Sequence, residues 1–215
     1  MVPRKERMEG EYGSREINES IRRLTQSSSR ITISNLSGQN SIGAGISGNY
    51  ELNLIGDAGD MLGAFNNGCV FIVKGSCGDN AGLNMFSGGL IIFDNCGEGC
   101  GTSMSGGIIV VKNKCGGYLG DWMRKGVILV DGDVEGEVGN NMRGGTIIVT
   151  RDIDGSVGMD SLSGEVYVGG KTGMIEKSFI RGETGKKDID YLRKYFEHYA
   201  IDAEPSSLRK YVKKS

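Results

Sequence analysis

Cysteine is the residue type in this sequence whose spacing most suggests chemistry. Cys77, Cys96 and Cys115 are each 19 residues apart, and Cys100 follows Cys96 by four. Ligation of zinc or of an iron–sulfur cluster needs about four thiolates that converge on one point. A 19-residue ladder would instead place its sulfurs in a line. The rest of the same series consists of the plain core residues Ala58, Val134 and Ile153. We therefore interpret the ladder as small buried side chains in a narrow core, in preference to a metal or cluster site.

The other groups that could do chemistry are isolated. His198 is the only histidine, and no G-x-S-x-G motif accompanies it. A Ser-His-Asp hydrolase would have to use this histidine, which we instead expect on the surface. A series of acidic side chains, Asp60, Asp79 and Glu98, could bind a cation, but no loop of fixed length supplies further oxygen ligands.

Two glycine-rich segments resemble nucleotide-binding motifs. Residues 43–48 match G-x-G-x-x-G, but the following Tyr50–Ile55 is strand-like, whereas a dinucleotide fingerprint needs a helix there. Gly169–Thr172 matches the end of a P-loop, but Glu165 stands where its first glycine is required. The sequence therefore predicts no catalytic, cofactor-binding or metal-binding residue, and no cofactor.

The elements that would position these residues are set by a repeat of glycine. Glycine makes up 37 of the 215 residues, roughly twice its average usage. One series is spaced by 19 throughout, and a second by 20 once and then by 19. The first series is Gly63, Gly82, Gly101, Gly120, Gly139 and Gly158; the second is Gly68, Gly88, Gly107, Gly126, Gly145 and Gly164. A fixed period of this length indicates a solenoid.

A short β-branched run follows each glycine of the second series. The runs are Val70–Val73, Leu90–Phe93, Ile108–Val111, Val127–Val130, Thr146–Val149 and Val166–Val168. They are too short for helices and lie between glycine turns, so we expect strands. The near-constant register places each residue over its counterpart in the next turn, which we call a rung. The predicted fold is all-β: a right-handed, single-stranded parallel β-helix of about seven 19-residue rungs, with short flanking helices.

The repeat also predicts which positions face inward. A nearly apolar series three residues before each glycine of the second series should line the core: Phe65, Met85, Met104, Met123, Met142 and Ser161. The acidic series shares its register with Gly117, Gly136 and Gly155, which is typical of a solvent-facing corner.

The flanks differ from the repeat. Residues 14–24 have helical spacing of apolar side chains, with Ser14 as N-cap, and residues 187–200 have it again. Solenoids need covered ends, and we expect these two helices to supply the covers. The predicted organisation is residues 1–34 as an N-terminal helix and a strand leading into the repeat, 35–170 as the β-helix, and 171–215 as a basic helical extension.

Charge and composition exclude some classes of partner. Residues 35–170 hold 7 Lys/Arg and 15 Asp/Glu, whereas residues 171–215 hold 11 and 7. An acidic body argues against nucleic acid. No run is apolar enough to span a membrane, and residues 1–14 lack the apolar core of a signal peptide. With five cysteines in no secreted-domain spacing, we expect a cytoplasmic protein. Homo-oligomerisation is left open.

Three segments carry a family resemblance: REINESIRRL, ITISNLSGQNSIGAGISG and GDAGDMLGAFNNGCVFIVKG. Over about residues 14–170 the chain resembles the C-terminal β-helical domain of glutamate synthase large subunits, named for its GXGXG repeats. Formylmethanofuran dehydrogenases contain a subunit with a similar repeat domain. The resemblance implies an architectural role between glutaminase and flavin, iron–sulfur synthase parts, and it transfers no catalytic residue. We expect a structural subunit without catalysis of its own; the alternatives are a stand-alone enzyme such as a hydrolase, or the β-helical component of a formylmethanofuran dehydrogenase.

Overall fold

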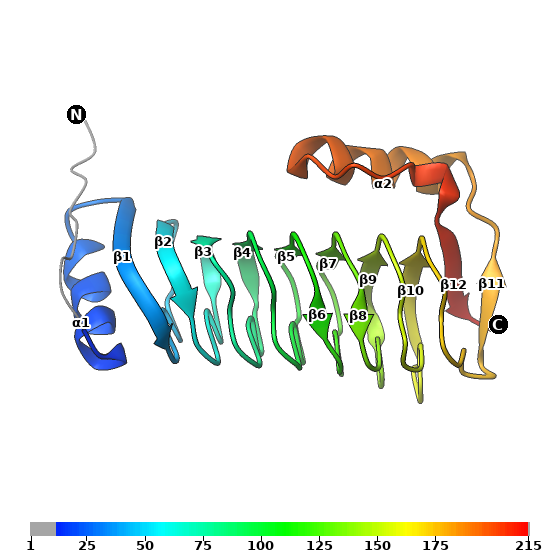
Figure 1. The fold of residues 1–215 in the computed structure, drawn as a ribbon, viewed down its shortest axis with the longest axis horizontal. Coiled ribbons are helices and arrows are strands. Elements are labelled where there is room, and N and C mark those ends of the chain that lie inside the picture. Colours follow the sequence, from blue (N-terminus) through cyan, green and yellow to red (C-terminus); the bar gives the residue numbers. More distant parts are fainter. Residues whose placement is uncertain (1–11, 215) are drawn as a thin grey trace.

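The protein is an elongated parallel β-solenoid. The computed structural model describes residues 12–214, so the segment in which no signal peptide is predicted lies mostly outside them. The solenoid has about seven turns, which confirms the predicted fold (Figure 1). The elements are α1 (Ser14–Leu24), β1 (Arg30–Gln39), β2 (Glu51–Ala58), β3 (Asn67–Lys74), β4 (Ser87–Ile92), β5 (Ile108–Val111), β6 (Cys115–Gly116), β7 (Val127–Val130), β8 (Val134–Glu135), β9 (Arg143–Val149), β10 (Ser163–Val168), β11 (Phe179–Gly182), α2 (Lys186–Tyr199), the 3₁₀ helix η1 (Pro205–Ser207) and β12 (Arg209–Lys213).

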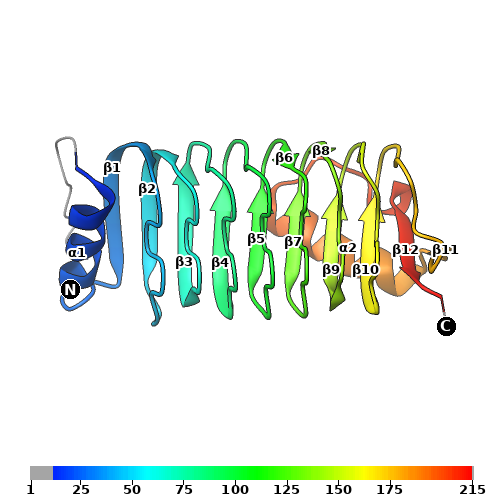
Figure 2. The same ribbon diagram turned by 90° about the horizontal axis from the view of Figure 1, so that it is seen from below.

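One sheet runs the length of the molecule, in the order β1-β2-β3-β4-β5-β7-β9-β10-β12-β11 (Figure 2). From β2 to β10 the strands pair in parallel, and equivalent residues are 19 apart. The innermost column is Leu52, Phe71, Leu90, Ile109, Ile128, Ile147 and Val166. All seven are fully buried, so this column lines the core of the solenoid.

The glycine turns are tight because the next rung fills the space beside them. Gly101 has a φ of +70°, and a Cβ there would contact the Cδ1 atom of Ile128. The first glycine series stacks as predicted, since each N–H from Gly82 onward donates to a carbonyl of the preceding rung. A side chain at these corners would therefore meet both backbone strain and the core.

The predicted inward column is wrong at one position. Met85, Met104, Met123, Met142 and Ser161 are fully buried, but Phe65 is 45% exposed. Its place is taken by Asn66, which is three residues after Gly63 as Met85 is after Gly82. The side chain of Asn66 exchanges two hydrogen bonds with the backbone of Cys69, of 2.8 and 3.1 Å. The 20-residue interval between Gly68 and Gly88 marks this irregular rung, and counting from the first glycine series gives the correct column.

The N-terminal end is covered by α1, as predicted (Figure 1). Ile17, Ile21 and Leu24 are buried and continue the core of the solenoid. The N-cap is Gly13 rather than the predicted Ser14, which is the first helical residue.

The C-terminal end is covered by strands, which corrects the expectation of a helical cap. β12 pairs antiparallel with β10, and β11 with β12. A change from parallel to antiparallel pairing ends the stack, and Phe179 of β11 closes the core.

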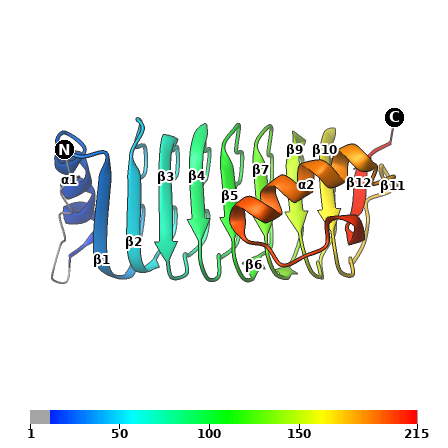
Figure 3. The same cartoon turned by 90° about the horizontal axis from the view of Figure 1, so that it is seen from above.

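α2 instead lies along the outer face of the main sheet, over β5 to β10 (Figure 3). Its buried residues, Leu192 and Phe196, pack on the outward side chains of these strands. Asp188 accepts hydrogen bonds from the Tyr167 hydroxyl at 2.7 Å and from Lys210 Nζ at 2.8 Å. Burial raises the pKa of Asp188, but the hydrogen bonds from Lys210 and Tyr167 outweigh it and leave that pKa lowered. The predicted basic extension is therefore held against the main sheet by the buried apolar face of α2 and by the hydrogen bonds of Asp188.

Replacement of Gly101 by alanine should destabilise the protein more than replacement of Gly45. Gly45 also has a positive φ, +71°, but a Cβ there meets nothing within 4 Å. We expect Gly45→Ala to cost about 1–2 kcal/mol through backbone strain alone. Gly101→Ala should cost about 1–3 kcal/mol more because of overpacking against Ile128. Urea unfolding monitored by circular dichroism measures both, and equal losses would contradict the account of the corners.

Candidate functional site

The single histidine lies on the surface of the protein. His198 is exposed on α2, and its ring packs against that of Tyr199, with centroids 4.6 Å apart. This confirms the surface position expected from the sequence.

The cysteine ladder is present but is not a simple line. Cys77, Cys96 and Cys115 pair through the backbone of successive rungs, with Val134 next in the column, and all are buried. Cys100 lies across the corner from Cys96 in the same rung. The sulfurs of Cys96, Cys100 and Cys115 all lie within 4.8 Å of one another, the one such group of ligand side chains among residues 12–214. The expectation that the sulfurs do not converge is therefore wrong. We call these three residues the thiol triangle.

Contacts among the thiols shift their acidities. Hydrogen bonding with Cys100 and Cys96 lowers the pKa of Cys115. The pKa values of Cys96 and Cys100 are raised, chiefly by hydrogen bonding with Cys100 and Cys115 respectively, with a further contribution from burial.

The acidic series lies at a solvent-facing corner, as predicted. Asp60, Asp79 and Glu98 are exposed. Asp60 Oδ1 accepts the N–H of Asp79 at 2.9 Å, and Asp79 Oδ1 accepts that of Glu98 at 2.8 Å. The carboxylates of Asp60 and Asp79 thus satisfy the backbone of the next rung, which is a structural role.

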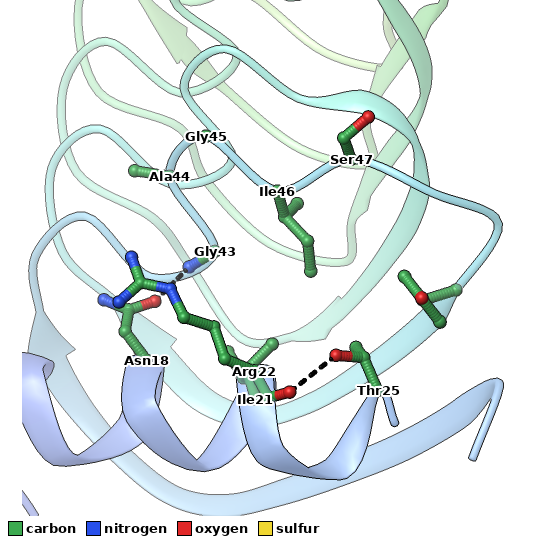
Figure 4. Close-up of a pocket in the computed structure, with 10 residues that line it drawn as sticks. Asn18, Ile21, Arg22, Thr25, Gly43, Ala44, Gly45, Ile46 and Ser47 are labelled. Carbon is green, nitrogen blue, oxygen red and sulfur yellow. Dashed lines mark hydrogen bonds between the residues drawn. The ribbon is translucent and has the colours of Figure 1, made fainter. Parts of the chain in front are cut away.

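A cavity of about 230 Å³ separates α1 from the G-x-G-x-x-G segment (Figure 4). Arg22 lines it and has no ion pair within residues 12–214. The loop's own donors are already used: Gly43 N–H donates to Asn18 Oδ1 at 2.7 Å, and Gly45 N–H donates to Ala64 O at 2.7 Å. These two N–H groups are therefore committed within the fold and are not free to cradle a phosphate.

A surface feature that sequence reasoning missed follows the turns of the first glycine series. Met61 and Phe65 flank Gly63, and Tyr118 and Trp122 flank Gly120 three rungs further on. We call these four side chains the apolar edge. They are between 36% and 48% exposed and have φ values from +54° to +58°. Large residues rarely adopt this left-handed conformation, at a cost of order 1–3 kcal/mol each.

The first of the two intervening rungs shows which residue type this backbone conformation favours. At the positions equivalent to Met61 and Phe65 it has Asn80 and Asn84, with φ values of +58° and +53°. Asparagine tolerates this conformation. The sequence does hold a signal for the apolar edge: large apolar residues stand two residues before and after a glycine of the first series, where the first intervening rung has asparagine.

Comparisons with known proteins give a likeness to a solved structure. No family model matches the sequence, and no curated protein matches it. Among solved structures, the chain is similar to a chain in the crystal structure of the formyltransferase/hydrolase complex from Methylorubrum extorquens in complex with methylofuran. The two share 26% identity with a TM-score of 0.71, over 80% of this chain and 68% of that chain. The likeness supports a role as a subunit of an enzyme complex and lends some support to the formylmethanofuran-related resemblance. No helix among the described residues is long and apolar enough to cross a membrane.

Replacement of Cys96 should show how apolar this column is. Val134 occupies the next but one place in it, so Cys96→Val should change stability by less than about 1.5 kcal/mol. Cys96→Ser should cost about 1–3 kcal/mol, because its hydroxyl would have weakly accepting sulfurs as neighbours and the Gly78 carbonyl only at about the 4.0 Å of the present sulfur. Urea unfolding of the reduced proteins compares them. A serine variant as stable as the valine variant would disprove the apolar environment.

Proposed function

We propose that this chain is a structural subunit that holds the catalytic subunits of an enzyme complex at a fixed separation, without catalysis of its own. The observation that carries the proposal is the apolar edge. Its side chains are exposed and sit on backbone conformations that asparagine would occupy at lower cost. Residues that lower stability without filling the core are typical of binding surfaces, and Tyr and Trp are enriched among interface hot spots.

The assembly that we favour is of the formyltransferase/hydrolase type. The likeness to a chain of such a complex supports it and extends over most of both chains. Formyl transfer and hydrolysis would then belong to the partner subunits. The glutamate synthase type is the second candidate, supported by the resemblance of residues 14–170, and its partners would be glutaminase and flavin, iron–sulfur synthase subunits. The identity of the co-purifying enzymes separates the two candidates.

The double variant Tyr118→Asn/Trp122→Asn should lose its partners without losing stability. Two hot-spot residues contribute about 2 kcal/mol or more each to binding, so co-purification of catalytic subunits from the native source should fall at least tenfold. Unfolding should be unchanged or should require more urea, because asparagine relieves the left-handed strain.

A matched control changes exposed apolar residues outside the edge. Leu162 and Met174 are 62% and 57% exposed, and Leu162→Asn/Met174→Asn should retain the partners. Full retention of the partners by the Tyr118/Trp122 variant would refute the edge as the docking surface.

The purified chain should show no turnover in glutaminase, glutamate synthase, esterase or formyl-hydrolysis assays. Catalysis needs acid, base or nucleophilic groups within hydrogen-bond reach of one another, and within residues 12–214 the one interaction of His198 is a ring contact with Tyr199. Turnover by the lone chain that His198→Ala abolishes would establish the hydrolase alternative instead.

A further inference from the structure

The thiol triangle has the dimensions of a metal site. A thiolate lies about 2.3 Å from zinc and at similar distances from other soft ions, so three sulfurs around one ion are roughly 4 Å apart. The sulfurs of Cys96, Cys100 and Cys115 are already within 4.8 Å of one another. Small side-chain rotations would therefore close the triangle on an ion without any movement of the backbone ladder.

The fourth nearby cysteine cannot complete a tetrahedron. Cys77 Sγ is 3.3 Å from Cys96 Sγ. However, Cys77 and Cys115 are two rungs apart, which is roughly 9.6 Å along the stack. Their sulfurs cannot both approach one ion while the rungs keep their spacing. Among residues 12–214 the thiol triangle therefore offers three thiolates and no fourth cysteine, whereas structural zinc sites are almost always four-coordinate.

We propose that Cys96, Cys100 and Cys115 bind one soft, monovalent cation of the copper(I) class in three-coordinate geometry. Thiolates select such ions over hard cations, and the surrounding column is apolar. Each thiol that becomes a ligand as thiolate releases its proton to solvent. Coordination by one thiolate would leave a neutral site, and each further proton lost adds one negative charge.

The surface outside the triangle offers a route for a cation. A shallow hollow of about 590 Å³ is lined by Cys96 and Cys115 themselves. Its rim carries three carboxylates against one ammonium group: Asp79, Glu98 and Glu135 against Lys114. Lys114 is paired with Glu135 at 3.1 Å, which leaves two carboxylates to attract cations.

The fifth cysteine supplies a distant control. Cys69 is buried, but its sulfur contacts the Gly48 carbonyl at 3.3 Å and no other sulfur among the described residues. Replacement of Cys69 should leave metal binding unchanged. Cys77→Val is the closer control, because it makes the same substitution in the same column as Cys115→Val.

The test is an anaerobic titration of the whole reduced chain with copper(I) in competition with a chromophoric copper(I) chelator. We expect one equivalent to bind, with protons released. Cys115→Val and Cys100→Ala should weaken binding by more than about 100-fold, because loss of a ligand exceeds the 10–100-fold effect of outer-shell changes. Cys77→Val and Cys69→Ala should stay within about tenfold of the wild type.

Circular dichroism and urea unfolding identify any variant that has failed to fold. Each replacement is a residue that the adjacent rung already has at the equivalent position, so the fold should tolerate it. Ala81 is the equivalent of Cys100, and Val134 is the equivalent of Cys115. No competition with the chelator by the folded wild type would overturn the proposal. A loss in Cys77→Val as large as in Cys115→Val would overturn the three-sulfur geometry, as would tighter binding of zinc(II) than of copper(I).

Discussion

The constraint on which the rest of the structure depends is the in-register stacking of rungs. Parallel backbone pairing fixes the spacing between rungs, and the 19-residue period places each position on its own equivalent. A side chain in this fold is therefore surrounded above and below by residues of the same column. The column therefore decides which residue types fit at a position. Valine, isoleucine and cysteine replace one another in one corner column, whereas in another the aspartates accept hydrogen bonds from the backbone of the next rung.

The same constraint explains where strain is tolerated. The tight corners require left-handed backbone, which glycine provides without a Cβ and asparagine provides with little cost. Met61, Phe65, Tyr118 and Trp122 occupy such positions with large exposed side chains. Arg143 also places its guanidinium carbon 5.7 Å from the centre of the Trp122 ring. A rigid stack can hold such residues because the hydrogen bonds of neighbouring rungs over-determine the backbone at each turn.

The repeat makes most of the fold predictable from the sequence, because a periodic pattern determines both the strands and their register. The runs Ile108–Val111 and Val127–Val130 are strands with the predicted bounds. Phe65 is misplaced when the period is counted across an irregular rung. The position of α2 is not predictable, since an amphipathic helix can cover the end or the side of a solenoid equally well. The position of α2 depends on the apolar outer face of the sheet around Ile148 and Tyr167, and the strand pattern alone does not show whether that face is covered or exposed.

The geometry of a solenoid also explains why binding is the expected function. Catalytic groups must converge, but the outward side chains of stacked strands stand roughly perpendicular to the sheet, and those inside fill a dry core. Within the core, side chains converge at an inner corner, where two residues of one rung face each other across the turn and meet a third from the next rung. Cys96, Cys100 and Cys115 satisfy this condition. The sequence does not reveal that the Cys100 sulfur belongs to this group. Its distance from the Cys96 sulfur depends on how sharply the chain turns between the two residues, and the repeat pattern shows which residues stack but not how sharply a rung turns. The outer face, by contrast, offers long and rigid surfaces that suit the docking of other proteins.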